Sequence, residues 1–119
     1  MKNLSKWYKD WEVGENKSKE KEDSLRIIET FKDFLTDYKI DEKSKSTQNR
    51  YYGHLHALGG YLIEESIDDD GDIIELLLNS IDAYEGPLIY MSNESWQREL
   101  DAVCKKLYKF MIKKGNTNN

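Results

Sequence analysis

The fold is decided by residues 24–38, SLRIIETFKDFLTDY, in which large apolar side chains recur every three or four positions. That spacing places them on one face of an α-helix and predicts a wide stripe facing a core. Asp23 or Ser24 can cap the first turn, because its side-chain oxygen accepts a hydrogen bond from a free backbone N–H. The stripe consists of Ile27, Ile28, Phe31, Phe34, Leu35 and Tyr38.

Three later segments repeat this periodicity, and none alternates apolar and polar residues for long enough to predict a strand. The first starts at a cap on Ser46 or Thr47 and runs through Gly59-Gly60, where a kink and a close helix crossing are both open. The second covers residues 73–81. The third starts at Ser92 or Asn93, continues the stripe from Trp96, and stops at Gly115. We therefore expect an all-α, four-helix bundle whose core contains Phe31, Phe34, Leu55, Leu58, Leu77, Leu100, Val103 and Leu107.

An aromatic arm precedes this bundle. Leu4, Trp7, Tyr8 and Trp11 follow i, i+3, i+4, i+7 spacing and predict a short extra helix. Residues 14–23 contain no large apolar side chain and predict a solvated, charged linker. The expected organisation is an N-terminal helical arm (1–13), the linker (14–23), a helical domain (24–115) and a disordered tail (116–119). The two tryptophans must be buried, either in their own domain, which we favour, or in a homodimer partner.

Composition excludes several classes of protein. The 119 residues suit one domain, and no apolar run approaches the ~20 residues that span a bilayer. No apolar stretch typical of a secretory signal follows Met1. The single Cys104 allows neither an internal disulfide nor a zinc site built from cysteines. We expect a soluble, reduced, cytoplasmic protein.

The residue types that usually carry chemistry are not arranged for it. His54 and His56 are two positions apart, so on a helix they point to different faces and cannot share a metal ion. The run 68–72 looks like a calcium loop, but alignment on Gly71 places Ser66 and Leu77 at the first and last ligand positions. We therefore expect no catalytic residues, no metal and no cofactor.

Charge is distributed unevenly along the chain, whose formal net charge is −5. Residues 51–95 contain 10 acidic residues and no Lys or Arg, whereas residues 96–119 contain 6 basic and 2 acidic residues. Two interpretations of this pattern are open. The acidic middle can pack beside basic neighbours in the same fold, or one basic face can bind phosphates. Basic and small polar residues gather at the starts of the third and last core helices, where free N–H groups and the helix dipole favour phosphate.

Three stretches carry a resemblance: Ile28–Tyr38, Ser46–Tyr52 followed by Leu55 and Leu58, and Trp96–Gly115. Over residues 24–114 the chain resembles the core-binding, SAM-like N-terminal domain of tyrosine recombinases and phage integrases. The resemblance implies contact with double-stranded DNA at helix starts, which in this sequence are marked by Lys45, Thr47, Arg50, Arg98 and Lys105. Nothing here supplies that family's catalytic Arg, His-x-x-Arg and Tyr set.

A second resemblance is closer and longer. The chain is similar to a group of short uncharacterised prokaryotic proteins that carry Leu58-Gly59-Gly60, Gly86-Pro87-Leu88 and the 104–108 sequence CKKLY. That resemblance implies no activity. The sequence thus predicts a non-catalytic helical binding module that contacts DNA. The alternative is a protein-interaction module that uses the acidic middle and the arm residues Trp7, Tyr8 and Trp11.

Overall fold

Five α-helices and one 3-10 turn follow one another along residues 1–117, the part of the chain that the computed structural model describes. No strand occurs among these residues, so the expected all-α class is confirmed. Residues 118–119 of the predicted tail lie outside the described residues. The elements are α1 (Trp7–Trp11), α2 (Lys17–Asp37), η1 (Ile40–Glu42), α3 (Lys45–Ser66), α4 (Ile73–Ser80) and α5 (Glu94–Thr117).

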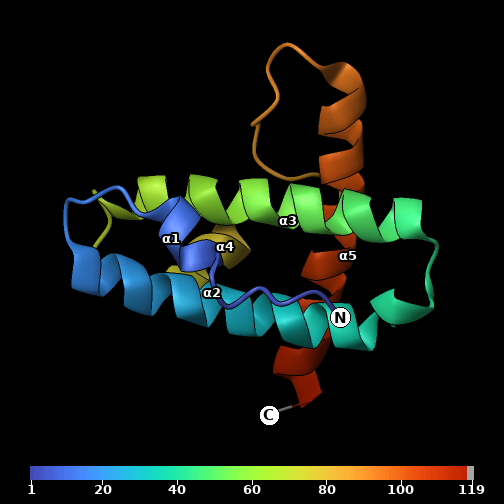
Figure 1. Ribbon diagram of the computed structural model, residues 1–119, viewed down its shortest axis with the longest axis horizontal. Helices are drawn as coiled ribbons and strands as arrows, with labels where there is room; N and C mark the ends of the chain where they lie inside the picture. Colours follow the sequence, from blue (N-terminus) through green and yellow to red (C-terminus); the bar gives the residue numbers. More distant parts are fainter. Residues whose placement is uncertain (118–119) are drawn as a thin grey trace.

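Helices α2 and α3 lie side by side in opposite directions, and α5 crosses both of them (Figure 1). The short helices α1 and α4 each pack against the same α2–α3 pair. The eight residues predicted to share one core are all buried, with at most 2 % of each exposed. Burial of one such Leu or Phe side chain stabilises the fold by about 1.5–3 kcal/mol.

The charged linker predicted over residues 14–23 is wrong in extent, because α2 begins at Lys17. Asn16 caps this helix, and its side-chain oxygen accepts a hydrogen bond of 3.2 Å from the backbone N–H of Lys19. Five of residues 17–23 are Lys or Glu, straight-chain residues that lose little side-chain freedom in a helix. The predicted helix over 24–38 is therefore the second part of a longer one, and only a short connection after α1 is not helical.

Glu20 organises that connection. Its carboxylate is buried and accepts hydrogen bonds from the backbone N–H groups of Asn16 (2.8 Å), Val13 (2.7 Å) and Gly14 (3.0 Å). The bond from Asn16, with those from Gly14 and Val13, outweighs the effect of burial and lowers the pKa of Glu20. Glu20 thus holds the end of the arm against the first turn of α2.

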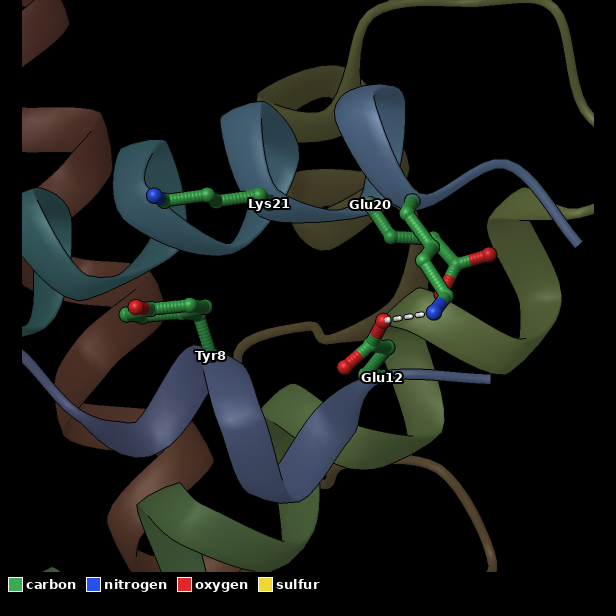
Figure 2. Close-up of a pocket in the computed structure, with 5 residues that line it drawn as sticks. Tyr8, Glu12, Glu20 and Lys21 are labelled. Atoms are coloured by element: carbon green, nitrogen blue, oxygen red, sulfur yellow. Dashed lines mark ion pairs between the residues drawn. The ribbon is translucent and has the colours of Figure 1, made fainter. Parts of the chain in front are cut away.

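Figure 2 shows the place where α1 faces the start of α2. Tyr8, Glu12 and Lys21 lie around a small cavity of about 110 Å³, together with Lys17 and Glu20. Lys17 and Glu12 form an exposed ion pair of 3.7 Å, which contributes little to stability. Lys21 Nζ lies 4.9 Å from the centre of the Tyr8 ring. Tyr8 and Glu12 of the arm therefore contact the first turns of α2.

Trp11 is inserted against α3 at the paired glycines. A Cβ atom built on Gly59 would overlap the Trp11 indole ring, and one on Gly60 would lie 3.4 Å from Trp11 Cδ1. The indole Nε1–H donates a 2.9 Å hydrogen bond to the backbone carbonyl of His56. The space left at Gly59-Gly60 is therefore filled by a side chain of α1, and α3 continues through both glycines.

The arm packs within its own domain, as favoured from the sequence. Trp7 is 7 % exposed and Trp11 is 4 % exposed. Trp7 also meets the His56 ring edge to face, with 5.1 Å between ring centres. The interpretation of Trp7 and Trp11 as protein-interaction residues is therefore wrong, because both belong to the hydrophobic core. Tyr8 is half-buried against Lys21.

Two further helix ends differ from the sequence prediction, and one agrees with it. Ser44, rather than Ser46 or Thr47, caps α3 by accepting a 3.2 Å hydrogen bond from the Thr47 N–H. Gly115 does not stop α5, which extends to Thr117. Asn93 caps α5, and its Oδ1 accepts a 3.0 Å hydrogen bond from the Trp96 N–H. Trp96 itself was expected in the core but is 55 % exposed.

Candidate interaction surface

The residues predicted to contact DNA lie on α3 and α5, but carboxylates accompany the two arginines. Arg50 Nε lies 3.7 Å from Glu99 Oε1, and Arg98 Nη2 lies 3.7 Å from Glu94 Oε2. Each carboxylate offsets part of the positive charge that a phosphate would meet. The Arg50–Glu99 pair does bring the first half of α3 next to α5. The other three predicted residues are exposed or half-buried on the same helices: Lys45, Thr47 and Lys105.

A groove between α2 and α5, which we call the basic groove, combines lysines with aromatic rings. Lys106 Nζ lies 5.0 Å and Lys43 Nζ 4.7 Å from the centre of the Tyr38 ring. The π-face of an aromatic ring attracts an ammonium group, so Tyr38 holds these two positive charges near each other. None of the five predicted DNA-contact residues lines this groove. Its volume is about 210 Å³, and it is lined by Phe34, Asp37, Tyr38, Lys106, Lys109, Phe110 and Lys113.

The largest exposed apolar side chains gather on the segment between α4 and α5 and on the first turn of α5. Tyr84 is 83 % exposed, Met91 81 %, Leu88 62 % and Trp96 55 %. We call these four residues the apolar surface. Figure 1 shows that this segment and the first turns of α5 project past α3, on the side away from α2. Trp96 belongs to the first turn of α5 and meets the Tyr90 ring of the segment.

The segment is irregular, but Gln97 fixes its backbone. The Gln97 side-chain Oε1 accepts hydrogen bonds from the N–H groups of Ile89 (3.1 Å) and Tyr90 (3.0 Å). Its Nε2 donates to the carbonyl of Pro87 at 2.9 Å. One amide side chain on α5 therefore satisfies three backbone groups that would otherwise need water. Ile89 and Tyr90 are half-buried as a result, while Leu88 between Pro87 and Ile89 remains exposed.

Asp101, one helical turn after Gln97, fixes the earlier part of the segment. Its Oδ1 accepts hydrogen bonds of 3.0 Å from the Gly86 N–H and from Gln97 Nε2. A Cβ atom at Gly86 would overlap the Cys104 sulfur, so only glycine allows this close approach. Cys104 is fully buried, and burial raises the pKa of its thiol to about 12. The thiol is therefore protonated near neutral pH and serves to pack the segment.

His54 connects the segment to α3. Its Nε2 lies 3.0 Å from Glu99 Oε1, and its Nδ1 lies 3.0 Å from the Tyr90 hydroxyl. The Glu99 carboxylate can only accept, which assigns the imidazole proton to Nε2 and makes Tyr90 the donor to Nδ1. Burial, together with the negative charge of Glu99, raises the pKa of Tyr90. Tyr90 also meets Trp96 edge to face, with 5.6 Å between ring centres, so the network reaches the apolar surface.

A second, open groove, which we call the acidic groove, separates the segment from α3 and the end of α1. Its volume is about 500 Å³. Leu88, Ile89 and Met91 form the side contributed by the segment. Acidic side chains come from α1 and α3, and no Lys or Arg lines the groove. The remaining lining residues are Asp10, Trp11, His56, Ala57, Gly60, Tyr61, Glu64 and Glu65.

None of the helices expected from the sequence covers residues 83–91, an apolar stretch without regular spacing. In the structure Ile89 and Tyr90 are half-buried, while Tyr84, Leu88 and Met91 are exposed. The signal that was available is the pair Gln97 and Asp101, two polar residues one turn apart on α5. Side chains that bond to a distant backbone leave no mark in apolar periodicity, so the exposed side of the segment was missed.

Within residues 1–117, no group of three or more His, Cys, Asp or Glu side chains is arranged to hold a metal ion. No helix in the same range combines the length and the apolar character that a membrane span requires. Comparisons of the chain with protein-family models, with curated proteins and with solved structures gave no match. The resemblance to integrase core-binding domains therefore stays a prediction.

Proposed function

We propose that this protein is a non-catalytic helical module that binds another polypeptide through the apolar surface of Tyr84, Leu88, Met91 and Trp96. One observation carries the proposal: four large apolar side chains are exposed on a backbone that Gln97 and Asp101 hold in place. Large apolar side chains that are exposed together on one ordered segment mark an interaction site more often than a single exposed hydrophobe does.

The residue types and their rigidity both favour protein binding. Tyr, Trp and Met are enriched in protein interfaces, where they contribute large contact areas. Ordering a loop on binding weakens affinity, because the loop loses conformational freedom. Here the backbone bonds of Ile89, Tyr90 and Gly86 already order the segment. A partner therefore meets a surface that is already formed.

Site-specific photo-crosslinking in the native cell tests this function. A photoreactive amino acid replaces Leu88, and the matched control replaces Thr36, which is exposed on α2. We expect a discrete adduct of higher mass from position 88, none from position 36, and loss of the adduct when Met91→Asp is added. The absence of any adduct from position 88, or the same adducts from both positions, contradicts the proposal.

Nucleic acid is a second candidate ligand, and the basic groove favours it. Lys43, Lys106 and Lys109 lie around Tyr38 and Phe110, and an aromatic floor beside ammonium groups suits a phosphate backbone with unstacked bases. Duplex contact at Lys45, Thr47, Arg50, Arg98 and Lys105 also stays a proposal.

Anisotropy with labelled duplex and single-stranded DNA at several salt concentrations separates these two modes. Removal of a phosphate contact lowers the slope of log affinity against log salt by about 0.7–0.9. Lys106→Gln with Lys109→Gln should do so for the basic groove, and Arg50→Ala or Arg98→Ala for the helix starts. Lys9→Gln on α1 is the control. If neither DNA binds even at low salt, the nucleic-acid candidate is wrong.

A further inference from the structure

We infer that the acidic groove binds a basic amphipathic helix of the partner protein. This inference rests on the proposed function and names the chemistry of the partner. It concerns the side of the segment that faces α3, where Leu88, Ile89 and Met91 meet a single face of that helix.

The α3 side of the groove is a continuous helix face. Ala57, Gly60, Tyr61 and Glu64 follow i, i+3, i+4, i+7 spacing, so they lie one above another along α3. Ala57 has a small side chain that leaves room for an incoming helix, whereas Trp11 covers Gly60, 3.4 Å from a Cβ atom built there. The acidic groove therefore has apolar residues on both sides, from this face of α3 and from the segment.

Charge identifies the polar side of the partner. Glu64 and Glu65 are exposed at the groove and form no ion pair within residues 1–117. The negative charge of Glu65, after burial, contributes to the raised pKa of Tyr61, so its field reaches into the groove. Asp10 adds a third carboxylate, which lies 3.0 Å from His56 Nε2. Charges of one sign at a groove select a partner of the opposite sign.

The helical face of α3 at the groove favours a partner that is itself a helix. A peptide that binds as a strand must pair with an exposed sheet edge, and residues 1–117 contain no strand. A helix satisfies its own backbone hydrogen bonds and binds a groove through apolar anchors at i, i+3, i+4 and i+7. Nucleic acid is disfavoured at this groove, because Glu64, Glu65 and Asp10 repel phosphates.

Two synthetic helices test the inference on the full chain. Both carry the same Leu face, but one has Lys and the other Glu on its polar face, and each carries a fluorescent label for anisotropy. We expect the Lys helix to bind about tenfold more tightly than the Glu helix. Glu64→Lys with Glu65→Lys should reverse this preference. Glu29→Lys, exposed on α2, is the matched control and should leave it unchanged.

The outcomes separate this inference from the proposed function. Equal binding of both helices, with loss of binding in Met91→Asp, contradicts a basic partner and leaves protein binding in place. If neither helix binds while the adduct at position 88 forms, a helical partner is excluded but the function stands. If neither helix binds and no adduct forms, both proposals are wrong. A preference that Glu29→Lys alters as much as the groove variant also overturns the inference.

Discussion

The N-terminal arm and the segment before α5 are similar in apolar composition but differ in burial. Each is a short stretch rich in aromatic and aliphatic side chains outside the long helices. In the arm, Trp7 and Trp11 are buried. In the other stretch, Tyr84, Leu88 and Met91 are more than half exposed. Apolar composition therefore does not decide which stretch joins the core.

A side chain of such a stretch joins the core where a neighbouring helix leaves space for it. Gly59 leaves room on α3 that the Trp11 indole fills, and the carbonyl of His56 accepts its only donor. The glycine of the segment before α5 has a different effect. Gly86 brings the backbone, rather than a side chain, against Cys104, and the apolar side chains nearby remain outside.

The largest expected effect separates two tryptophans. Trp11→Ala should lower the free energy of unfolding by about 3–5 kcal/mol, because it leaves a cavity between α1, α2 and α3. Trp96→Ala should change it by about 1 kcal/mol or less, because this side chain is 55 % exposed and packs at the surface against Tyr90. Urea unfolding followed by circular dichroism measures both. Equal losses would show that the arm and the segment do not differ as described.

The next effect separates two glycines of α3. Gly59→Ala should destabilise the protein by about 1–3 kcal/mol, because the new methyl group displaces the Trp11 ring. Gly53→Ala is the matched control, since nothing lies within 4 Å of a Cβ there. It should stabilise the helix by about 0.5–1 kcal/mol. Thermal unfolding of the two variants checks the sign of each change in stability. A Gly59→Ala variant that is more stable than the wild type would contradict the packing of Trp11 against Gly59.

An effect of similar size that depends on pH concerns the connection that holds the arm. Glu20→Gln should cost about 1–3 kcal/mol at pH 7, because the buried carboxylate loses charge-assisted hydrogen bonds. The folded-state pKa of Glu20 lies below its ordinary value of 4.5. Its contribution is therefore present above that value and is lost as the pH falls through the folded-state pKa.

Urea unfolding from pH 7 down to pH 3 tests this sign. The difference between the wild type and Glu20→Gln should shrink as the solution becomes acidic. Glu22→Gln, exposed two positions later, is the control and should match the wild type throughout. A difference that stays constant with pH would mean that the carboxylate charge is not what Glu20 contributes.

Much of the fold could be predicted because helix periodicity reports burial directly. Phe31, Leu58 and Leu107 were placed in one core from spacing alone, and all three are buried. The start of α2 was missed because its first turn has no apolar residue, and Asn16 with Glu20 supplies the signal instead. Periodicity also placed Trp96 in the core, since a helix face continues in sequence even where its neighbours have ended.

The candidate site was harder to predict for the same reason. Its shape depends on Gln97 and Asp101, which bond to a backbone 7 to 15 positions away. Such bonds depend on the path of an irregular segment, and that path has no repeating pattern. The sequence shows that Trp7 and Trp11 are too apolar to remain in water. Whether they are buried in their own domain or in a partner depends on the space at Gly59, which only the structure reveals.

Hydrogen exchange at the indole N–H groups of Trp11 and Trp96 tests the division between the two regions most directly. The Trp11 indole N–H is hydrogen-bonded to His56 and buried, so it should exchange only when the protein opens. Trp96 is 55 % exposed and should exchange freely. We expect rates that differ by a factor on the order of a thousand. Similar rates would contradict the burial of the arm in the core and the exposure of Trp96 on the apolar surface.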